Sequence, residues 1–423
     1  MSTKKKKYDV IIAGGGIAGV SCAYNCAKLN LKTLLVEKEN YLGGDITGSL
    51  VVPVMKCDMG NLNQDFYNEL IKSAKESGAQ IEYEDKNPAW FNPIILKNTL
   101  DTILIKKGVD ILFEAEISDV SIFENYIKEV KIFTGLLSLP IVSNYFVDTT
   151  GDASFSKLLN CELWQDTQRK QPPSLRFIIS GVDLEELKNF LDNLDDDKNV
   201  TTTYRIDRDI HLSTACTWDN SKKWALKPYF TEAVNAGILE PSDEAYFQIF
   251  TVAHMPNSVA FNCPRLADYN ANNPFEYSKR LIEARSSILR LHSFVKNYIP
   301  GFKNSFISNI ASKTGKREVC RVKCQYDYTV DDIINEKKFQ NPALRSNYPI
   351  DIHSNKKDES VLHKVCSYEL PVESLKSKDY TNLYVAGKIV GADFKAQAAL
   401  RVQSSCMSMG EAVAKDIRKN IKY

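Results

Sequence analysis

Three glycines near the start of the chain have the spacing of a phosphate-binding turn. Gly14, Gly16 and Gly19 follow an apolar run of strand type, residues 10–13, and open a helical pattern. In such a turn the first glycine allows a tight bend, the second lets the backbone approach a pyrophosphate, and the third lets helix and strand pack closely. The helix N-terminus adds N–H groups and a positive dipole end. The motif predicts a site for an adenine dinucleotide.

An acid and a second glycine pair complete this unit. A second apolar run, residues 33–36, ends at Glu37, where a carboxylate can accept hydrogen bonds from ribose hydroxyls. Gly43 and Gly44 follow at a spacing typical of FAD, where the backbone must again pass close to the pyrophosphate. A NAD site would normally continue into the next crossover helix. A lone glycine motif is weak evidence, but here both strands, the helix and the acid accompany it.

Several later segments carry a resemblance to known flavoproteins. Residues 145–152 (YFVDTTGD) and 383–388 (LYVAGK) are strand patterns that end in glycine motifs. In this order they resemble the superfamily that binds FAD through a glutathione-reductase-like Rossmann domain. Segments 172–183, 315–322, 328–333 and 401–412 narrow the resemblance to the bacterial FAD-dependent oxidoreductase family, over nearly the whole chain.

The sequence departs from the family pattern in two places. Lys388 stands where many FAD folds have an aspartate that binds the ribityl chain, and residues 403–405 replace a usual Pro-Thr pair. Asp152 is the acid that could serve instead of the missing one. The motifs and the resemblance together predict FAD as cofactor and no metal. The expected cofactor-binding residues are Gly14, Gly15, Gly16, Ile17, Ala18, Gly19, Glu37, Lys38, Gly43, Gly44, Asp45, Ile117, Thr150, Gly151, Asp152, Gly387, Cys406 and Met407.

Three arginines are the candidates for contact with a substrate. Arg176 follows a strand pattern expected beneath the flavin, and a structural ion pair is the alternative. Arg317, if helical, shares a face with Arg321, and two guanidinium groups side by side suit a carboxylate or phosphate; an ion pair with Glu318 is the alternative. Arg401 precedes the helix expected to face the flavin. If these side chains converge, the substrate is expected to be an anion.

Three further side chains have reactive groups but weaker signals. Cys406 lies at a probable helix start, where it is either a thiol of low pKa or a small buried residue whose backbone alone matters. Cys57 and His254 are each either an acid or base or, more simply, structural.

Missing motifs exclude one flavoprotein class and argue against two others. A redox-active disulfide after the second glycine pair is excluded, because Ile46 and Val51 occupy its positions. There is no second dinucleotide motif and no Asp-Gly dipeptide, which disfavours a nicotinamide domain and an aromatic hydroxylase.

Composition indicates an ordinary globular protein of two domains. The chain has 423 residues, 43% of them hydrophobic, and a net charge of +1, which argues against nucleic-acid binding. No apolar run is long enough to span a membrane, and its ten cysteines are scattered. With no export signal, we expect free thiols and a cytoplasmic location.

The expected fold is α/β, with a Rossmann-like FAD-binding domain, a β-meander and an inserted α+β lobe that covers the substrate. Residues 1–163 and 366–423 are assigned to the discontinuous FAD domain, and residues 164–365 to the lobe. Helices are expected at 17–29, 61–77, 93–107 and 274–298, strands at 8–13, 33–36 and 110–113, the meander near 119–133, and a surface turn at 192–199.

The leading hypothesis is an FAD-dependent oxidoreductase that moves a hydride or electron pair between flavin and a small organic substrate. The alternatives are a flavoprotein that uses FAD in a non-redox or RNA-modifying step, and an electron-transfer flavoprotein that works with a partner. The sequence leaves the substrate, the electron donor or acceptor and the oligomeric state open.

Overall fold

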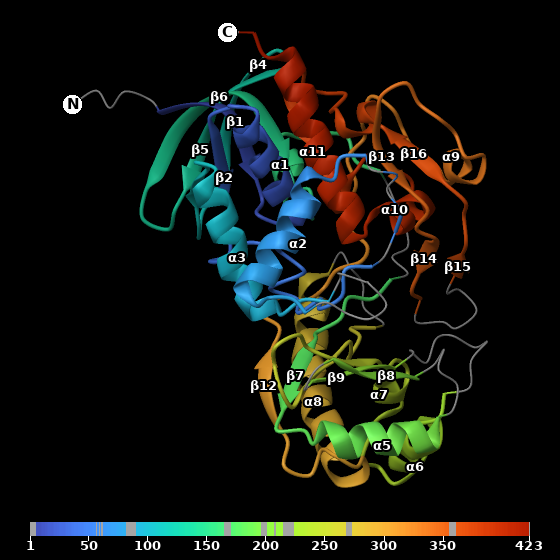
Figure 1. Cartoon of the computed structure of the whole chain (residues 1–423). Helices are drawn as coiled ribbons and strands as arrows, with labels where there is room; N and C mark the ends of the chain where they lie inside the picture. Colours follow the sequence, from blue (N-terminus) through green and yellow to red (C-terminus); the bar gives the residue numbers. More distant parts are fainter. Residues whose placement is uncertain are drawn as a thin grey trace.

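The computed structural model describes residues 6–422 except 56, 59, 61, 82–89, 165–170, 196–200, 207–208, 215–223, 268–272 and 355–360. Two β-sheets organise these residues, one toward each end of the molecule (Figure 1). The first sheet holds the glycine turn, and the second belongs to the middle of the chain.

The first sheet combines a parallel Rossmann-like part with a meander. Its order is β3-β2-β1-β6-β5-β4, and β17 pairs with the end of β6. The parallel strands are β1 (Lys6–Ala13), β2 (Thr33–Val36), β3 (Asp110–Leu112), β6 (Ser138–Asp148) and β17 (Leu383–Val385). The antiparallel meander joins β4 (Glu116–Phe123) and β5 (Tyr126–Phe133) to the first half of β6.

Both faces of the parallel part are covered, which explains why its strands are continuous apolar runs. Val10 and Ile12 pack toward the helices, while Ile11 and Ala13 pack toward the meander, since side chains alternate along a strand. The helices on this sheet are α1 (Ile17–Lys28), α2 (Asp65–Ser77), α3 (Pro93–Lys106) and α11 (Gln403–Asn420), with the short α4 (Ser154–Leu158) beyond β6.

Local signals set the helix ends as the sequence predicts. Asn92 caps α3 by accepting hydrogen bonds from the N–H groups of Ile94 and Ile95, and Pro93 follows as its first residue. Gly78 ends α2 in the left-handed conformation, with φ of +74°. The α/β fold class with a meander is confirmed.

The second sheet is antiparallel and forms its own core. Its order is β12-β7-β11-β10-β9-β8, and its packing includes stacked rings of Phe177 and Phe261, 4.5 Å apart. Its strands are β7 (Phe177–Ser180), β8 (Thr201–Ile206), β9 (Asp209–Thr214), β10 (Ile249–Thr251), β11 (Ser258–Phe261) and β12 (Phe306–Ile310). Its helices are α5 (Leu184–Leu194), α6 (Lys227–Asn235), α7 (Pro241–Glu244) and α8 (Pro274–Tyr298).

The segment between the second sheet and β17 packs mainly against the hydrophobic core of the first sheet and its helices. Tyr328, Leu344 and Ile352 belong to the same buried cluster as α1 and α11. This segment contains α9 (Val330–Ile334), the pairs β13 (Pro342–Ser346) with β16 (Tyr368–Pro371) and β14 (Ile350–Ile352) with β15 (Val361–His363), and, after β17, α10 (Phe394–Leu400). The domain boundaries remain a proposal, and this packing favours an end of the inserted lobe before residue 328.

Two sequence-based expectations are wrong. Residues 311–329 contain no helix, so Arg317 and Arg321 are not one helical turn apart. Residues 192–194 belong to the end of α5 rather than to a surface turn, and residues 196–199 lie outside the described residues. Within the described chain, no helix combines the length and apolar character that crossing a membrane requires.

Candidate functional site

A cavity of about 460 Å³ lies at the carboxyl ends of the parallel strands. It reaches from Glu37, at the end of β2, to Arg401 and Cys406 at the start of α11. Open α/β sheets bind ligands at this edge. All of the residues predicted to contact the cofactor line this cavity, except Gly15, Gly19 and Met407.

The three motif glycines differ in what surrounds them. A Cβ on Gly14 would lie 2.5 Å from the carbonyl oxygen of Thr149, and one on Gly19 would overlap the carbonyl oxygen of Gly14. Gly16 is different, because its Cβ would meet no atom of the chain nearer than Thr149 O, at 3.9 Å. Gly14 and Gly19 therefore permit the turn, whereas Gly16 leaves open space beside the cavity.

Glu37 holds the glycine turn as well as facing the cavity. Its Oε2 accepts a hydrogen bond from the N–H of Gly15 at 2.5 Å, and its Oε1 accepts one from the N–H of Glu39 at 2.8 Å. The sequence predicted only contact with ribose. The buried carboxylate also fixes the loop, a role that the motif spacing does not reveal.

Lys388 and Asp45 form an ion pair in the wall of the cavity. Lys388 Nζ lies 2.6 Å from Asp45 Oδ2 and donates to the carbonyl of Lys316 at 3.0 Å. Burial alone would raise the pKa of Asp45, but Lys388 and Lys313 outweigh it and hold that pKa below its usual range. Lys388 was not among the predicted cofactor residues. The sequence did offer a signal, because a lysine stands where many FAD folds have an aspartate.

Asp152 also lines the cavity, and its carboxyl group is ionised. Its Oδ1 accepts a hydrogen bond from the N–H of Ser154 at 3.1 Å, and its Oδ2 lies 3.7 Å from Lys38 Nζ. Burial favours the protonated form, but Lys38 and Ser154 more than compensate and lower the pKa of Asp152. The carboxylate of Asp152 is therefore available in the cavity. The sequence predicts that it serves in place of the aspartate that Lys388 replaces.

The start of α11 brings Cys406 to the cavity as a neutral thiol. Burial raises the pKa of Cys406 to about 12, and its Sγ donates to the carbonyl of Arg401 at 3.5 Å. The interpretation of Cys406 as a thiol of low pKa is therefore wrong. Met407 is buried behind it, where its carbonyl accepts a hydrogen bond from Ser21 Oγ at 2.6 Å.

The structure brings the three predicted arginines into one buried region. Arg176 Nε donates to Asn262 Oδ1 at 2.7 Å. Burial is the main cause that lowers the pKa of Arg176 and of Arg317, and neighbouring guanidinium groups, including Arg401, add to it. Arg317 Nη1 donates to the carbonyl of Pro172 at 2.9 Å, and Arg401 Nη2 donates to Asp351 Oδ2 at 3.2 Å.

A fourth arginine, Arg265, lies in the same region and was missed by the sequence analysis. Its Cζ lies 3.5 Å from the ring centroid of Tyr246, and its Nη2 lies 3.2 Å from His353 Nδ1. Arg265 follows Pro264 in a segment without regular structure. No motif spacing in the sequence connects it with the other three.

The remaining two candidates lie elsewhere. Cys57 Sγ is 2.9 Å from Ser404 Oγ, and burial raises the pKa of Cys57, so its thiol is neutral. His254 is an exposed turn residue with φ of +51° that does not line the cavity. Neither placement supports a role as acid or base.

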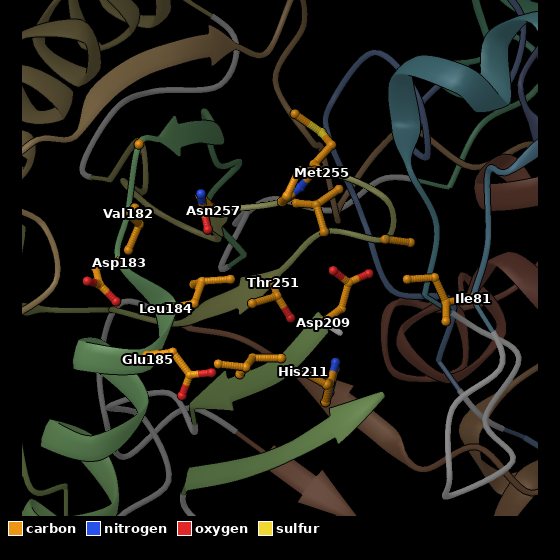
Figure 2. A pocket seen from close by; sticks show the side chains of 15 residues that line it. Ile81, Val182, Asp183, Leu184, Glu185, Asp209, His211, Thr251, Met255 and Asn257 are labelled. Carbon is orange, nitrogen blue, oxygen red and sulfur yellow. The ribbon is translucent and has the colours of Figure 1, made fainter. Parts of the chain in front are cut away.

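A second cavity, of about 440 Å³, lies beside the second sheet (Figure 2). Asp183, Glu185 and Asp209 are among its labelled residues in Figure 2, and none of the described residues that line it is a lysine or arginine. The charged side chains among these described residues are carboxylates, which do not suit a pyrophosphate, and the glycine turn lines the first cavity.

The glycine turn at the edge of the parallel sheet defines a dinucleotide-binding protein of the Rossmann type. The chain belongs to the FAD dependent oxidoreductase family, whose model matches residues 9–416. The predicted family is therefore confirmed, and membership of this family implies FAD as the cofactor.

Individual relatives match shorter parts of the chain. Digeranylgeranylglycerophospholipid reductase of Sulfolobus acidocaldarius is 29% identical over 179 residues, which are 38% of each chain. Thiamine thiazole synthase of Pyrococcus horikoshii is 28% identical over 34% of this chain and 57% of its own length. The chain thus matches well under two thirds of either relative's length.

One solved structure supports the fold over the whole chain. The p-nitrophenol 4-monooxygenase PnpA of Pseudomonas putida covers 99% of this chain, which covers 82% of that structure, with a TM-score of 0.52 and 10% identity. At this identity the likeness shows the fold alone.

The residues of the first cavity fit FAD. The open space beside Gly16 is one that any side chain would fill, as a closely approaching pyrophosphate requires. Lys38, Lys316 and Lys388 bring positive charge to the cavity, and Glu37 offers a carboxylate at the position for ribose. These residues would hold the phosphates and the adenosine end of the cofactor.

Proposed function

We propose that this oxidoreductase transfers a hydride or an electron pair between FAD and a small organic anion. The observation that carries this proposal is that the cofactor cavity borders the buried region of Arg176, Arg265, Arg317 and Arg401. We call it the arginine region. Arg401 lines the cavity and is also part of that region, and Leu175, which lines the cavity too, is the neighbour of Arg176.

FAD supplies the two-electron chemistry when it is bound, and the protein supplies position and charge. Gly16 admits the pyrophosphate, while Glu37 fixes the turn through Gly15. Lys388 brings a positive charge that Asp45 balances. These residues would hold one end of the cofactor.

At the other end of the cavity, near the start of α11, the protein offers positive charge. The helix α11 begins at Gln403, so the partial positive charge of its first N–H groups lies at the cavity wall. Arg401, held against Asp351, would fix a substrate anion beside that wall. Because Cys406 is a neutral thiol, we assign it no nucleophilic role.

The assay is anaerobic reduction of the purified protein by candidate organic anions, followed by flavin absorbance in a stopped-flow instrument. We expect at least one small carboxylate or phosphate compound to bleach the bound flavin, and acid precipitation to release FAD into the supernatant. The alternatives are a non-redox or RNA-modifying use of FAD, and electron transfer with a protein partner. If no small molecule reduces or reoxidises the flavin but a partner protein does, the result would favour electron transfer with a protein partner.

A further inference from the structure

The long helix α8, which lies against the second sheet (Figure 1), exposes a row of large apolar side chains to solvent. Phe275, Ile282 and Leu289 have relative exposures of 84%, 63% and 64%. Seven residues turn an α-helix through about two full turns, so these side chains form one row that drifts only about 20° per step. We call it the apolar row of α8. A single exposed apolar side chain is ordinary, but three in line form a patch.

The apolar row lies opposite the face of α8 that packs on the lobe. The buried residues of the helix are Ala284, Ser287, Ile288, Leu291, Phe294 and Val295. At 3.6 residues per turn, their mean direction is about 180° from that of Ile282. Ser278, Ser286 and Ser293 lie beside the row and are exposed as well, so no charge interrupts it. The outer face of a helix in a globular protein is normally polar, and here it is not.

The charges that flank the apolar row are positive. Lys279 and Arg285 lie on opposite sides of it, each about 60° from the direction of its middle residue. Lys296 lies about 40° from that direction, on the same side as Arg285. Within the described part of the chain, no acid pairs with any of these three cations, and Lys296 Nζ donates to the carbonyl of Ser305 at 3.4 Å.

The other two arginines of α8 have acid partners. Arg280 Nη1 donates to Glu283 Oε2 at 2.7 Å, and Arg290 Nε donates to Asp243 Oδ2 at 2.7 Å. The remaining acid of the helix, Glu276, lies in its first turn and about 120° from the direction of the row. The row therefore carries an excess of positive charge. Two copies of this face would each bring that excess to a shared interface, which disfavours self-association.

The neighbouring face of α8 lines the cofactor cavity. Tyr277, Leu281 and Arg285 are part of the wall of that cavity, and each is one helical turn from the next. Arg285 is exposed as well as part of the wall, so it marks the mouth of the cavity beside the apolar row. A partner on the row would therefore lie next to that mouth.

We propose that α8 docks on the surface of a membrane that contains anionic phospholipids. Apolar side chains in a row enter the boundary between headgroups and acyl chains, while lysine and arginine side chains beside them reach the lipid phosphates. A protein interface of standard size buries about 800 Å² on each side, more than one row of three side chains offers. A flat anionic surface needs no such area. The inference goes beyond the proposed function and does not depend on it.

The test is flotation of the FAD-loaded protein with lipid vesicles. Vesicles of phosphatidylcholine that contain about 30% phosphatidylglycerol are compared with vesicles of phosphatidylcholine alone. We expect binding to the anionic vesicles to be stronger by about ten-fold or more, since each lysine or arginine near such a surface contributes about five-fold. Added salt should weaken that binding, because it screens charge. No binding to the anionic vesicles, or equal binding to both kinds, would overturn the inference.

Variants locate the contact on α8. Ile282→Ser should weaken binding to the anionic vesicles about ten-fold, because it removes a buried apolar side chain from the bound state. Lys279→Gln should weaken it about five-fold. Neither residue lines the cofactor cavity, so FAD content and the thermal midpoint should stay near those of the wild type. If Ile282→Ser does not fold, Leu289→Ser in the same row replaces it.

Matched controls change the same kinds of side chain elsewhere. Leu136→Ser alters a leucine that is 92% exposed between β5 and β6, and Lys106→Gln alters an exposed lysine at the end of α3. Both should bind the anionic vesicles as the wild type does. Losses as large as those of the α8 variants would place the contact elsewhere and contradict the assignment.

Sedimentation velocity distinguishes a membrane from a second copy of the chain. We expect the wild type and Ile282→Ser to have the same mass at every protein concentration. A dimer of the wild type that Ile282→Ser abolishes would show that the apolar row joins two copies, and it would overturn the membrane assignment. Reduction of the flavin by small molecules is measured separately, so the proposed function stands or fails independently of vesicle binding.

Discussion

At the residue scale, the cofactor site separates glycines that form the turn from the glycine that admits a ligand. Gly14 and Gly19 face backbone atoms at distances that no Cβ tolerates, so their replacement would damage the turn itself. Gly16 faces open space. Substitution at Gly16 can therefore test ligand binding without first destroying the loop.

Gly16→Val is expected to abolish FAD binding while the protein still folds, because the branched side chain would occupy the space of the pyrophosphate. FAD content after reconstitution and the circular dichroism spectrum are the measurements. The control is Gly78→Ala, where φ is +74° and an added Cβ would meet no atom within 4 Å; it should cost stability of about 1 kcal/mol, yet leave FAD content unchanged. Normal FAD content in Gly16→Val would show that this glycine does not face the cofactor.

The ion pair between Lys388 and Asp45 makes a second test at the same scale. Asp45 stays ionised because Lys388 and Lys313 outweigh its burial. Removal of Lys388 would leave that carboxylate in the wall of the cofactor cavity without the lysine that lies 2.6 Å from it. The cost of such a change comes from the unpaired acid as much as from the lost cation.

Lys388→Met is expected to weaken FAD binding at least ten-fold, and the double variant with Asp45→Asn should recover most of the loss. The measurement is a double-mutant cycle on the dissociation constant of FAD, obtained by fluorescence titration. Lys303→Met, at an exposed lysine, is the control and should bind FAD normally. If the double variant binds as weakly as Lys388→Met alone, the two residues do not act as a pair.

At the element scale, the cavity depends on the close packing of α11 on α1. Gly410 makes this possible, because a Cβ there would overlap the carbonyl oxygen of Ala18 and lie 2.9 Å from the N–H nitrogen of Cys22. Both helices begin at the cavity, with Ile17 on α1 and Gln403 on α11. A displacement of either helix would shift both walls.

Gly410→Ala is therefore expected to lower both stability and FAD affinity. Overpacking of this kind costs about 1–3 kcal/mol, and the backbone atoms that it strikes cannot rotate away as a side chain can. Thermal unfolding and FAD content measure the two effects. Lys419→Ala, at the exposed end of the same helix, should change neither. A stable Gly410→Ala protein with full FAD content would show that α11 can shift without cost to the site.

Elements whose signals are local were predictable from the sequence. The bounds of β2 (Thr33–Val36) and α8 (Pro274–Tyr298) match the expected ones, because apolar runs, an Asn-Pro helix start and glycine stops act over a few residues. The six strands of the second sheet are short and pair over long sequence distances, so no local pattern gave their order. The same holds for residues 311–329, where tertiary contacts replace the helix expected from Arg317 and Arg321.

At the scale of the whole molecule, the buried region that contains Arg176, Arg265, Arg317 and Arg401 joins segments that the sequence keeps apart. The glycine turn and Glu37 were predictable because their spacing is fixed by one βαβ unit. Arg265, Tyr246 and His353 were not, because only the folded chain brings them together. Position in a motif reveals the cofactor, whereas the proposed substrate region arises only from tertiary structure.

The buried neutral His353 predicts how the stability of the whole molecule depends on pH. Because burial holds the pKa of His353 below its value of about 6.5 in the unfolded chain, the unfolded state binds a proton that the folded state does not as the pH falls below about 6.5. The folded state therefore loses about 1.4 kcal/mol of stability per pH unit below that value from this group alone. Between pH 7 and pH 5 Asp351 does not contribute, because its carboxyl is ionised in both the folded and the unfolded chain; its lowered folded pKa costs stability only as the pH falls further, toward about 4 and below.

His353→Gln removes this titration, and so its destabilisation relative to the wild type should shrink as the pH falls from 7 to 5. The free energy of unfolding of both proteins, loaded with FAD, is measured by denaturant at each pH. Arg205→Gln, which does not titrate in this range, should keep a constant difference from the wild type. A difference for His353→Gln that is the same at pH 7 and pH 5 would mean that the pKa of His353 is the same in the folded and unfolded chains, so that its ring is protonated at pH 5 in the folded protein as well. Arg265 would then lose its acceptor at Nδ1, and the orientation of its guanidinium would need another cause.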